Sequence, residues 1–305
     1  MSFTDNTTFY GKDALGFYSK ALLTGETKKA IKLYPNVKSK LKIASLDMSG
    51  LLSDADCTFT DKQTTVLAQK TLEVCDVKIN VEFCTTTFNQ NYLSEQLRAG
   101  SNGTGVDTVI PITFEEYVLE QIALNVSTDL ENILWNGVTS GTGGTPTDIC
   151  DGFRFKFSGD ATVVDVTATT LTASNIITEL GKVYDAIPAQ IIDDPNLTIF
   201  MSTKASKFYK QAQAAVATGS GSYFIGDKAL DFLGIKIIVS KQLPANVMVA
   251  ASTENLWMGT DLMSDFDDVL VIPQKDKSGA PTVRFVANFK FGVNYGAGSE
   301  IVYYW

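Results

Sequence analysis

The sequence predicts an α+β fold, in which one long helix lies against a β-sheet and a smaller α/β unit follows it. Three observations support this class. They are a long helical pattern at residues 113–137, a two-limbed β pattern at 37–84, and strict apolar alternation at 283–295. Between them, residues 160–262 alternate short apolar runs with helical patterns, which favours a mixed sheet covered by helices.

The long helical pattern begins with a capping signal and ends at a glycine. Thr113 is a good N-cap and Glu116 completes a capping box, while Gly137 is a natural C-terminal stop. Ser127 and Glu131 are expected to lie off the apolar face. The residues expected on that face are Val118, Leu119, Ile122, Ala123, Val126, Leu130, Ile133 and Leu134. By itself, this pattern predicts only an amphipathic helix that covers a sheet.

Residues 37–84 are predicted to form a long β-hairpin with limbs at 37–48 and 64–83 and a small, polar tip. The apolar alternation of the return limb changes parity at Cys75 and Asp76, which indicates a bulge or bend. Two interpretations stay open: an ordinary hairpin folded onto its own domain, or an extended loop laid over a neighbouring subunit. A two-stranded ribbon alone is only marginally stable in water, so it needs a surface to pack on.

The remaining elements follow in order. Residues 1–36 are predicted to form an arm, because they have no strong core pattern, with a short helix at 13–23. Another short helix is expected at 88–98, and an extended run after 150–153. The elements expected beyond residue 160 are a helix from Ser174 or Asn175 to Asp185, a strand at 197–201, a helix at 203–217, and strands at 235–239, 247–251, 255–258, 283–295 and 301–305.

The composition argues against an enzyme. The chain contains no histidine, which removes the commonest general base, the commonest metal ligand and every nucleophile that pairs with histidine. We find no catalytic constellation, no cofactor motif and no metal-ligand spacing, and therefore predict no catalytic, cofactor-binding or metal residues. The four cysteines, which lack CxxC spacing, are expected to be scattered small hydrophobic residues: Cys57, Cys75, Cys84 and Cys150.

The net charge of −9 is unevenly spread, because residues 1–42 hold eight lysines against three acidic residues. The strongly acidic remainder argues against a protein that reads nucleic-acid sequence, and the basic run is best explained as a solvated tail. No window has the roughly 18 consecutive apolar residues of a membrane span. The polar start lacks a signal-peptide core, so we expect a protein made and kept in a cytoplasm.

The order of these segments, together with several short motifs, resembles the major capsid proteins of tailed bacteriophages, which have the Hong Kong 97-type fold. ENILWNG at 131–137, GGTP at 143–146 and DGF at 151–153 are similar to the end of that family's spine helix and the loop that follows. FLGIKIIVSKQLP at 232–244 resembles its A-domain strand and turn, and FKFGVNYGAG at 289–298 resembles its closing strand.

The resemblance covers nearly the whole chain and implies a complete domain plan. The plan is an N-terminal arm at 1–36, an E-loop β-hairpin at 37–84, a P-domain at 85–155 with its spine helix at 113–137, an α/β A-domain at 156–262, and return strands of the P-domain at 263–305. No charged helical scaffolding segment precedes the arm. The resemblance therefore implies a scaffold that is a separate protein or unnecessary.

By this resemblance, the chain assembles with copies of itself, as hexamers and pentamers, into an icosahedral head that encloses double-stranded DNA. It implies that the chain assembles in the host bacterial cytoplasm and is located in the virion. It also implies that the DNA is held only by non-specific proximity and that no membrane is involved. Portal, scaffolding and decoration proteins are further candidate partners. The residues expected at contacts between subunits are Tyr18, Leu22, Leu46, Met48, Leu51, Leu52, Phe59, Val66 and Leu67.

Three alternatives stay open. An encapsulin, a bacterial compartment shell, has the same fold and would enclose a cargo enzyme instead of DNA. A histidine-free hydrolase would need a deep pocket that holds two carboxylates with raised pKa values. A tail or surface β-protein is disfavoured by the long helix and the α/β middle.

Overall fold

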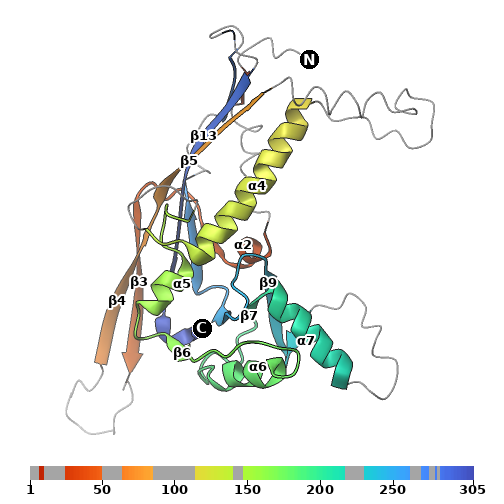
Figure 1. Cartoon of the computed structure of the whole chain (residues 1–305). Coiled ribbons are helices and arrows are strands. Elements are labelled where there is room, and N and C mark those ends of the chain that lie inside the picture. Colours follow the sequence, from red (N-terminus) through yellow and green to blue (C-terminus); the bar gives the residue numbers. More distant parts are fainter. Residues whose placement is uncertain are drawn as a thin grey trace, which may run out of the picture.

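The computed structural model describes residues 7–9, 25–49, 64–84, 114–139, 147–216, 230–261, 269–274, 279 and 282–305. These residues form two six-stranded sheets, a separate two-stranded ribbon and the helices that pack on them (Figure 1). Among them, no helix combines the length and apolar content needed to cross a bilayer. The helices expected at 13–23 and 88–98 lie outside the described residues.

The first sheet is built around the long strand β13 (Thr282–Tyr295). Its strand order is β1 (Thr7–Phe9), β12 (Val269–Pro273), β13, β11 (Leu256–Thr260) and β2 (Lys32–Tyr34), and β5 (Cys75–Cys84) also pairs with β13. The predicted alternation of β13 is confirmed, because its seven odd-numbered residues from 283 to 295 are at most 2% exposed. They face the core between this sheet and the helices.

The second sheet is covered on both faces. Its order is β6 (Val164–Val166), β14 (Val302–Tyr304), β10 (Met248–Ser252), β7 (Leu197–Ser202), β9 (Ile235–Ser240) and β8 (Asp231–Phe232). Alternate residues of one strand serve different cores: Phe200 packs with α4 and α5, whereas Ile199 and Met201 pack with α6 (Ile176–Asp185) and α7 (Thr203–Val216). Apart from β6 and β8, for which the sequence predicts no range, these elements lie within a few residues of their expected ranges. A short helix η2 (Gly298–Glu300) precedes β14.

Helix α4 (Phe114–Asn136) lies within one residue of its predicted range, and Figure 1 shows it running along the first sheet. Ile122, Leu130 and Leu134 are buried as expected. The expectation for Ser127 and Glu131 is wrong, since they are only 3% and 7% exposed. The physical reason is the short helix α2 (Glu26–Ala30), which packs against this side of α4 and supplies polar partners.

The segment after residue 152 is a helix, α5 (Phe153–Ser158), and not the extended run that we expected. The sequence FRFKFS alternates like a strand, but Phe153 and Phe157 are one helical turn apart and both are fully buried. Gly137 and Gly152 bring the end of α4 against the start of α5, and Gly152 N donates to the carbonyl of Gly137 at 2.8 Å. A Cβ at Gly137 would overlap the Cys150 carbonyl oxygen, so the glycine is needed for this close approach.

The ribbon consists of β3 (Lys40–Ser49) and β4 (Thr64–Glu73), paired antiparallel along their whole length. The return limb of the predicted hairpin divides at Val74: β4 stays in the ribbon, whereas β5 joins the first sheet beside β13. This division explains the change of parity in the sequence, because the two halves of the limb pack against different surfaces.

Candidate subunit interface

The ribbon β3–β4 extends away from the two sheets, at the lower left of Figure 1. Ten residues per strand give it a length of about 33 Å. Its register places Leu46 opposite Leu67, and the side chain of Leu67 is 62% exposed. A leucine this exposed on a two-stranded ribbon is a candidate contact for another molecule.

The nine residues predicted at subunit contacts are only partly covered by the structure. Leu46 and Met48 lie on β3, and Val66 and Leu67 lie on β4; of these four, Leu67 alone has a described side chain. The other five lie outside the described residues: Tyr18, Leu22, Leu51, Leu52 and Phe59. All nine stay predictions.

The root of the ribbon, where β3 and β4 meet the first sheet, has a small apolar core of its own. Leu72 of β4 is fully buried and packs with Val37 and Trp257, and Tyr34 meets the Trp257 ring edge-on at 5.8 Å between centroids. Leu41, Ile43 and Val74 surround this core and are partly buried. The root is therefore fixed by packing, while the exposed Leu67 lies further along the same strand.

A charged cluster, which we call the root clamp, adds directional contacts. Lys70 Nζ of β4 lies 2.9 Å from Asp160 Oδ2 and 4.4 Å from the centroid of the Tyr295 ring. The Tyr295 hydroxyl donates to the same carboxylate oxygen at 2.7 Å, and Thr162 donates to the other oxygen from its backbone N and its hydroxyl. The clamp thus connects the ribbon to β13 and to the turn after α5.

The pKa values of the root clamp follow from these contacts. Burial raises the pKa of the Asp160 carboxyl, but hydrogen bonds from Lys70, Thr162 and Tyr295 outweigh it and hold the pKa well below its usual value. Burial, followed by the hydrogen bond to the carboxylate, raises the pKa of Tyr295 far above its usual value. Asp160 therefore stays ionised and Tyr295 stays protonated near neutral pH.

Backbone contacts complete the root. Asn294 donates its side-chain amide to the carbonyl of Thr71 at 2.7 Å, and Val74 N donates to Ser39 O at 3.0 Å. Gly292 of β13 lies directly under the chain at this point, and a Cβ there would overlap the carbonyl oxygen of Glu73. The ribbon thus leaves the sheet over a position where only glycine fits.

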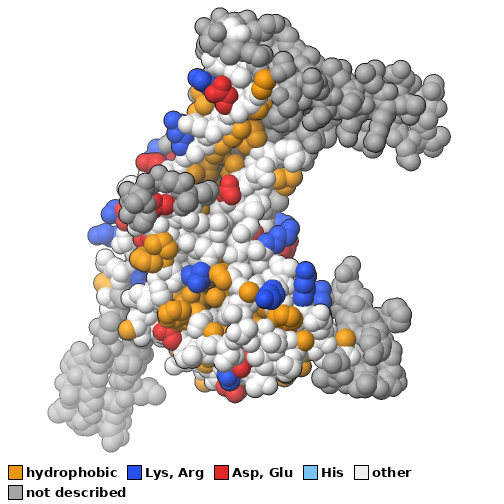
Figure 2. Space-filling view, in the orientation of Figure 1, with side chains coloured by type: hydrophobic (Ala, Val, Ile, Leu, Met, Phe, Trp, Pro, Cys, Tyr) orange, Lys and Arg blue, Asp and Glu red, His pale blue; other side chains and the backbone are white. Residues whose placement is uncertain are grey.

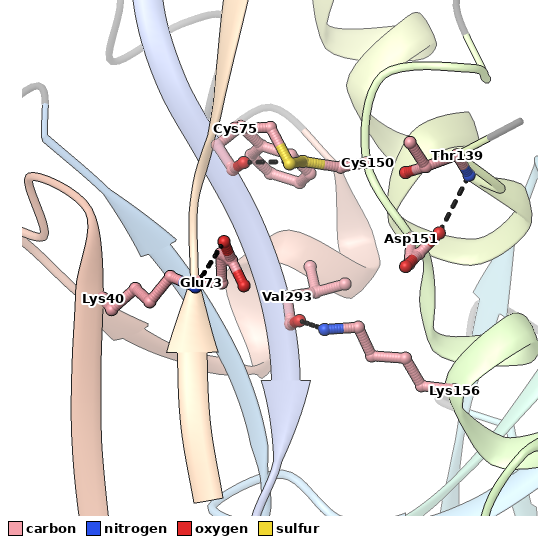
Figure 3. The surroundings of a disulfide bond; sticks show 9 residues. Lys40, Glu73, Cys75, Thr139, Cys150, Asp151, Lys156 and Val293 are labelled. Carbon is pink, nitrogen blue, oxygen red and sulfur yellow. Dashed lines mark hydrogen bonds and ion pairs between the residues drawn. A yellow bond between two sulfur atoms is a disulfide. The ribbon is translucent and has the colours of Figure 1, made fainter. Parts of the chain in front are cut away.

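A disulfide joins Cys75, the first residue of β5, to Cys150, in the turn before α5 (Figure 3). Our expectation that these two cysteines are unpaired hydrophobic residues is wrong. Their sequence separation of 75 gave no pairing signal, but the fold brings their Cα atoms to 6.0 Å, a normal separation for a disulfide. Cys84 is the last residue of β5, and Cys57 lies outside the described residues.

Comparisons with known proteins show the fold. No protein-family model matches the sequence, and no curated protein matches it. Among solved structures, the chain is similar to a chain of the "satellite phage P4 procapsid including size determination (Sid) protein", with 14% identity and a TM-score of 0.59, over 95% of this chain and 98% of that one. The capsid of a native GTA particle has 14% identity and a TM-score of 0.60, over 94% and 90%. The capsid of Myoviridae phage XM1 has 12% identity and a TM-score of 0.58, over 100% and 94%.

The fold is that of a tailed-phage major capsid protein.

In this capsid fold, a buried polar network ties α2 to α4 and β9. Glu131 accepts hydrogen bonds from Thr27 at 3.1 Å and Ser240 at 2.9 Å. Lys28, which is 1% exposed, donates to the hydroxyl and the carbonyl of Ser127 at 2.8 and 2.9 Å. Burial lowers the pKa of Lys28 from 10.5 to about 8, and the nearby Glu131 carboxylate opposes this shift. The described end of the arm is therefore anchored to the body of its own subunit.

Sequence reasoning missed the root clamp and this network, although both hold the elements of the capsid fold in place. Lys70 and Asp160 are 90 residues apart, and no local pattern connects them. One signal was available: Gly292 is an isolated glycine on the otherwise largely polar face of an alternating strand, and an isolated strand glycine often marks a close backbone approach. Within the described ranges, no three His, Cys, Asp or Glu side chains gather as a metal site requires.

Proposed function

We propose that this chain is the major capsid protein of a tailed phage, and that its copies assemble as hexamers and pentamers into an icosahedral head enclosing double-stranded DNA. The observation that carries the proposal is the ribbon, whose root is fixed by packing, a clamp and a disulfide while Leu67 beyond it stays 62% exposed. A rigid root and an exposed apolar limb suit a segment that packs on a neighbouring subunit. The capsid fold of the chain supports the same conclusion.

The proposal assigns roles to the parts of the chain. The ribbon acts as the E-loop, and α4 acts as the spine helix of the P-domain. The A-domain is built on the second sheet, which has α6 and α7 on one face and α4 and α5 on the other. Figure 2 shows hydrophobic side chains reaching the surface in several separate patches. The exposed large hydrophobic residues of the chain include Leu124 and Phe155, at 44% and 48%. Obligate interfaces of this kind commonly bury more than about 2,000 Å².

The net charge of the chain suits a shell that encloses DNA without binding it tightly. A net charge of −9 disfavours tight, salt-dependent binding to phosphates, so the packaged DNA is held by enclosure. Assembly takes place in the host bacterial cytoplasm and the product resides in the virion. Portal, scaffolding and decoration proteins are the further partners of such a shell.

Electron microscopy of the purified chain tests the proposal, with Leu67→Asp as the decisive variant. The matched control is Gln69→Asp, which adds the same charge two residues away on the exposed side of β4 without removing an apolar group. We expect closed particles from the wild type and a much larger loss of assembly for Leu67→Asp than for Gln69→Asp. Both variants should keep the wild-type circular dichroism, because neither side chain is buried.

Two outcomes would count against the phage proposal. A wild-type chain that stays monomeric under all assembly conditions would contradict a shell function altogether. Particles that co-purify with a cargo enzyme and lack DNA after expression in their natural context would instead identify an encapsulin.

A further inference from the structure

We propose that Cys75 and Cys150 form a redox-dependent lock on the root of the ribbon, held as two thiols during assembly in a reducing cytoplasm and closed to the disulfide after the particle is released. This inference rests on the proposed function, which places synthesis and release in different compartments. Thiols persist in the cytosol, whereas disulfides form and persist in oxidising surroundings. The two forms therefore belong to different stages in the life of one particle.

The position of the disulfide makes it a lock on the ribbon. Cys75 follows Val74, the residue at which β4 of the ribbon and β5 of the sheet diverge. Cys150 lies in the turn that joins α4 to α5, beside Gly137. Closing the bond therefore fixes the ribbon–sheet junction to the end of the longest helix, and Figure 3 shows the bond crossing between these two segments.

The same site accommodates the reduced form. The sulfur of Cys150 lies 3.2 Å from the carbonyl oxygen of Phe291, the residue of β13 paired with Cys75, so a Cys150 thiol can donate a hydrogen bond there. The turn also stays attached when the bond is open, because Lys156 of α5 donates to Val293 O at 2.7 Å (Figure 3). Reduction thus loosens the junction without removing the packing around it.

The chemistry is a thiol–disulfide exchange with a low-molecular-weight disulfide as oxidant. Cys150 is 3% exposed and Cys75 is more accessible, so the thiolate of Cys75 attacks first and forms a mixed disulfide, releasing one small thiol. The thiolate of Cys150 then attacks the sulfur of Cys75 and releases the second small thiol. The protein loses two electrons and two protons, and the oxidant gains both as it becomes two thiols.

Thiol alkylation of the particles tests the lock. Particles sampled inside quenched cells and particles held in oxidising medium after release are denatured in the presence of N-ethylmaleimide, so that buried thiols react too, and are then digested and analysed by mass spectrometry. We expect alkylation at both Cys75 and Cys150 inside the cell and at neither after release. A disulfide already complete inside the cell, or free thiols that persist after release, would overturn the proposal.

Hydrogen exchange tests whether the bond acts on the ribbon. We expect about tenfold slower exchange at residues 64–84 in oxidised particles than in reduced ones. The difference should disappear in Cys75→Ser and stay unchanged in Cys84→Ser, the matched control on the same strand. Equal exchange in the oxidised and reduced wild type would show a bond without locking action and overturn the proposal.

Failure of the lock can be told apart from failure of the proposed function. If no particles form, the shell function fails, and the same alkylation is performed on the soluble chain in cells and after transfer to a buffer containing oxidised glutathione. A soluble chain that changes from two thiols to a disulfide supports the lock, and one that does not change overturns it.

Discussion

The buried Lys28 gives the fold an unusual pH dependence that can be worked out from its surroundings. The pKa of this lysine is 10.5 in the unfolded chain and about 8 in the folded one, chiefly because burial disfavours its charge. At pH 7 Lys28 is protonated in both states, and its buried charge costs the folded state about 3 kcal/mol. As the pH rises through 8, the folded lysine loses its proton while the unfolded one keeps it.

Stability should therefore increase with pH over this window, since the unfolded state binds more protons. Above pH 10.5 Lys28 is neutral in both states and its burial no longer lowers the free energy of unfolding. That gain is lost again as the pH falls through 8, where the buried lysine takes up its proton. For these two pKa values, the free energy of unfolding rises by about 2 kcal/mol between roughly pH 7 and pH 9.5. Ending the window there avoids the ionisation of ordinary tyrosines in the unfolded chain.

Urea unfolding of the unassembled subunit at several pH values measures this change. We expect the rise in the wild type, a nearly flat profile in Lys28→Met, and an unchanged rise in Lys29→Met. Lys29 is the matched control because it is the next residue of α2 and its side chain is 57% exposed. Parallel profiles for the wild type and Lys28→Met, or a fall in wild-type stability over the window, would refute the reasoning.

Three further changes test the root and the core. Gly292→Val should lower the free energy of unfolding by more than about 2 kcal/mol, because the new side chain overlaps the Glu73 carbonyl; an unchanged urea midpoint would contradict the close approach. Asp160→Asn should cost about 1 kcal/mol, a modest value because Lys70 and Asp160 are 36% and 22% exposed. The lowered pKa of Asp160 means that this contribution is fully present at neutral pH and decreases as the pH falls below the ordinary carboxyl pKa of about 4, so the difference between variant and wild type in urea unfolding should shrink between about pH 5 and about pH 2. Phe157→Ala should cost about 3–5 kcal/mol, because this fully buried ring contacts three other aromatic rings, and calorimetry that shows no loss would disprove its place in the core.

The sequence was most informative where local periodicity and burial agree. The alternation of β13 predicted its seven buried residues because one face of that strand is packed and the other is largely polar. The capping signal and apolar stripe located α4 within one residue, and short apolar runs located the strands of the second sheet.

Periodicity did not predict burial or residue pairing where these depend on segments that are distant in the sequence. Glu131 is buried because α2, about 100 residues earlier in the chain, covers it, and nothing within α4 signals this. The sequence of α5 does not distinguish a helix from a strand, because two phenylalanines four residues apart also satisfy a period of two. The pairing of Cys75 with Cys150 and the pairing of Lys70 with Asp160 depend on chain topology, which local sequence does not encode.

The place of β14 in the second sheet has a consequence for biosynthesis. This strand follows every other strand in the chain, yet it lies between β6 and β10, and both its faces are buried. In a nascent polypeptide that still lacks β14, the edge strand β6 has no strand to pair with and one side of β10 is unpaired, so apolar surface stays open there. The second sheet can therefore be completed only after β14 has left the ribosome exit tunnel.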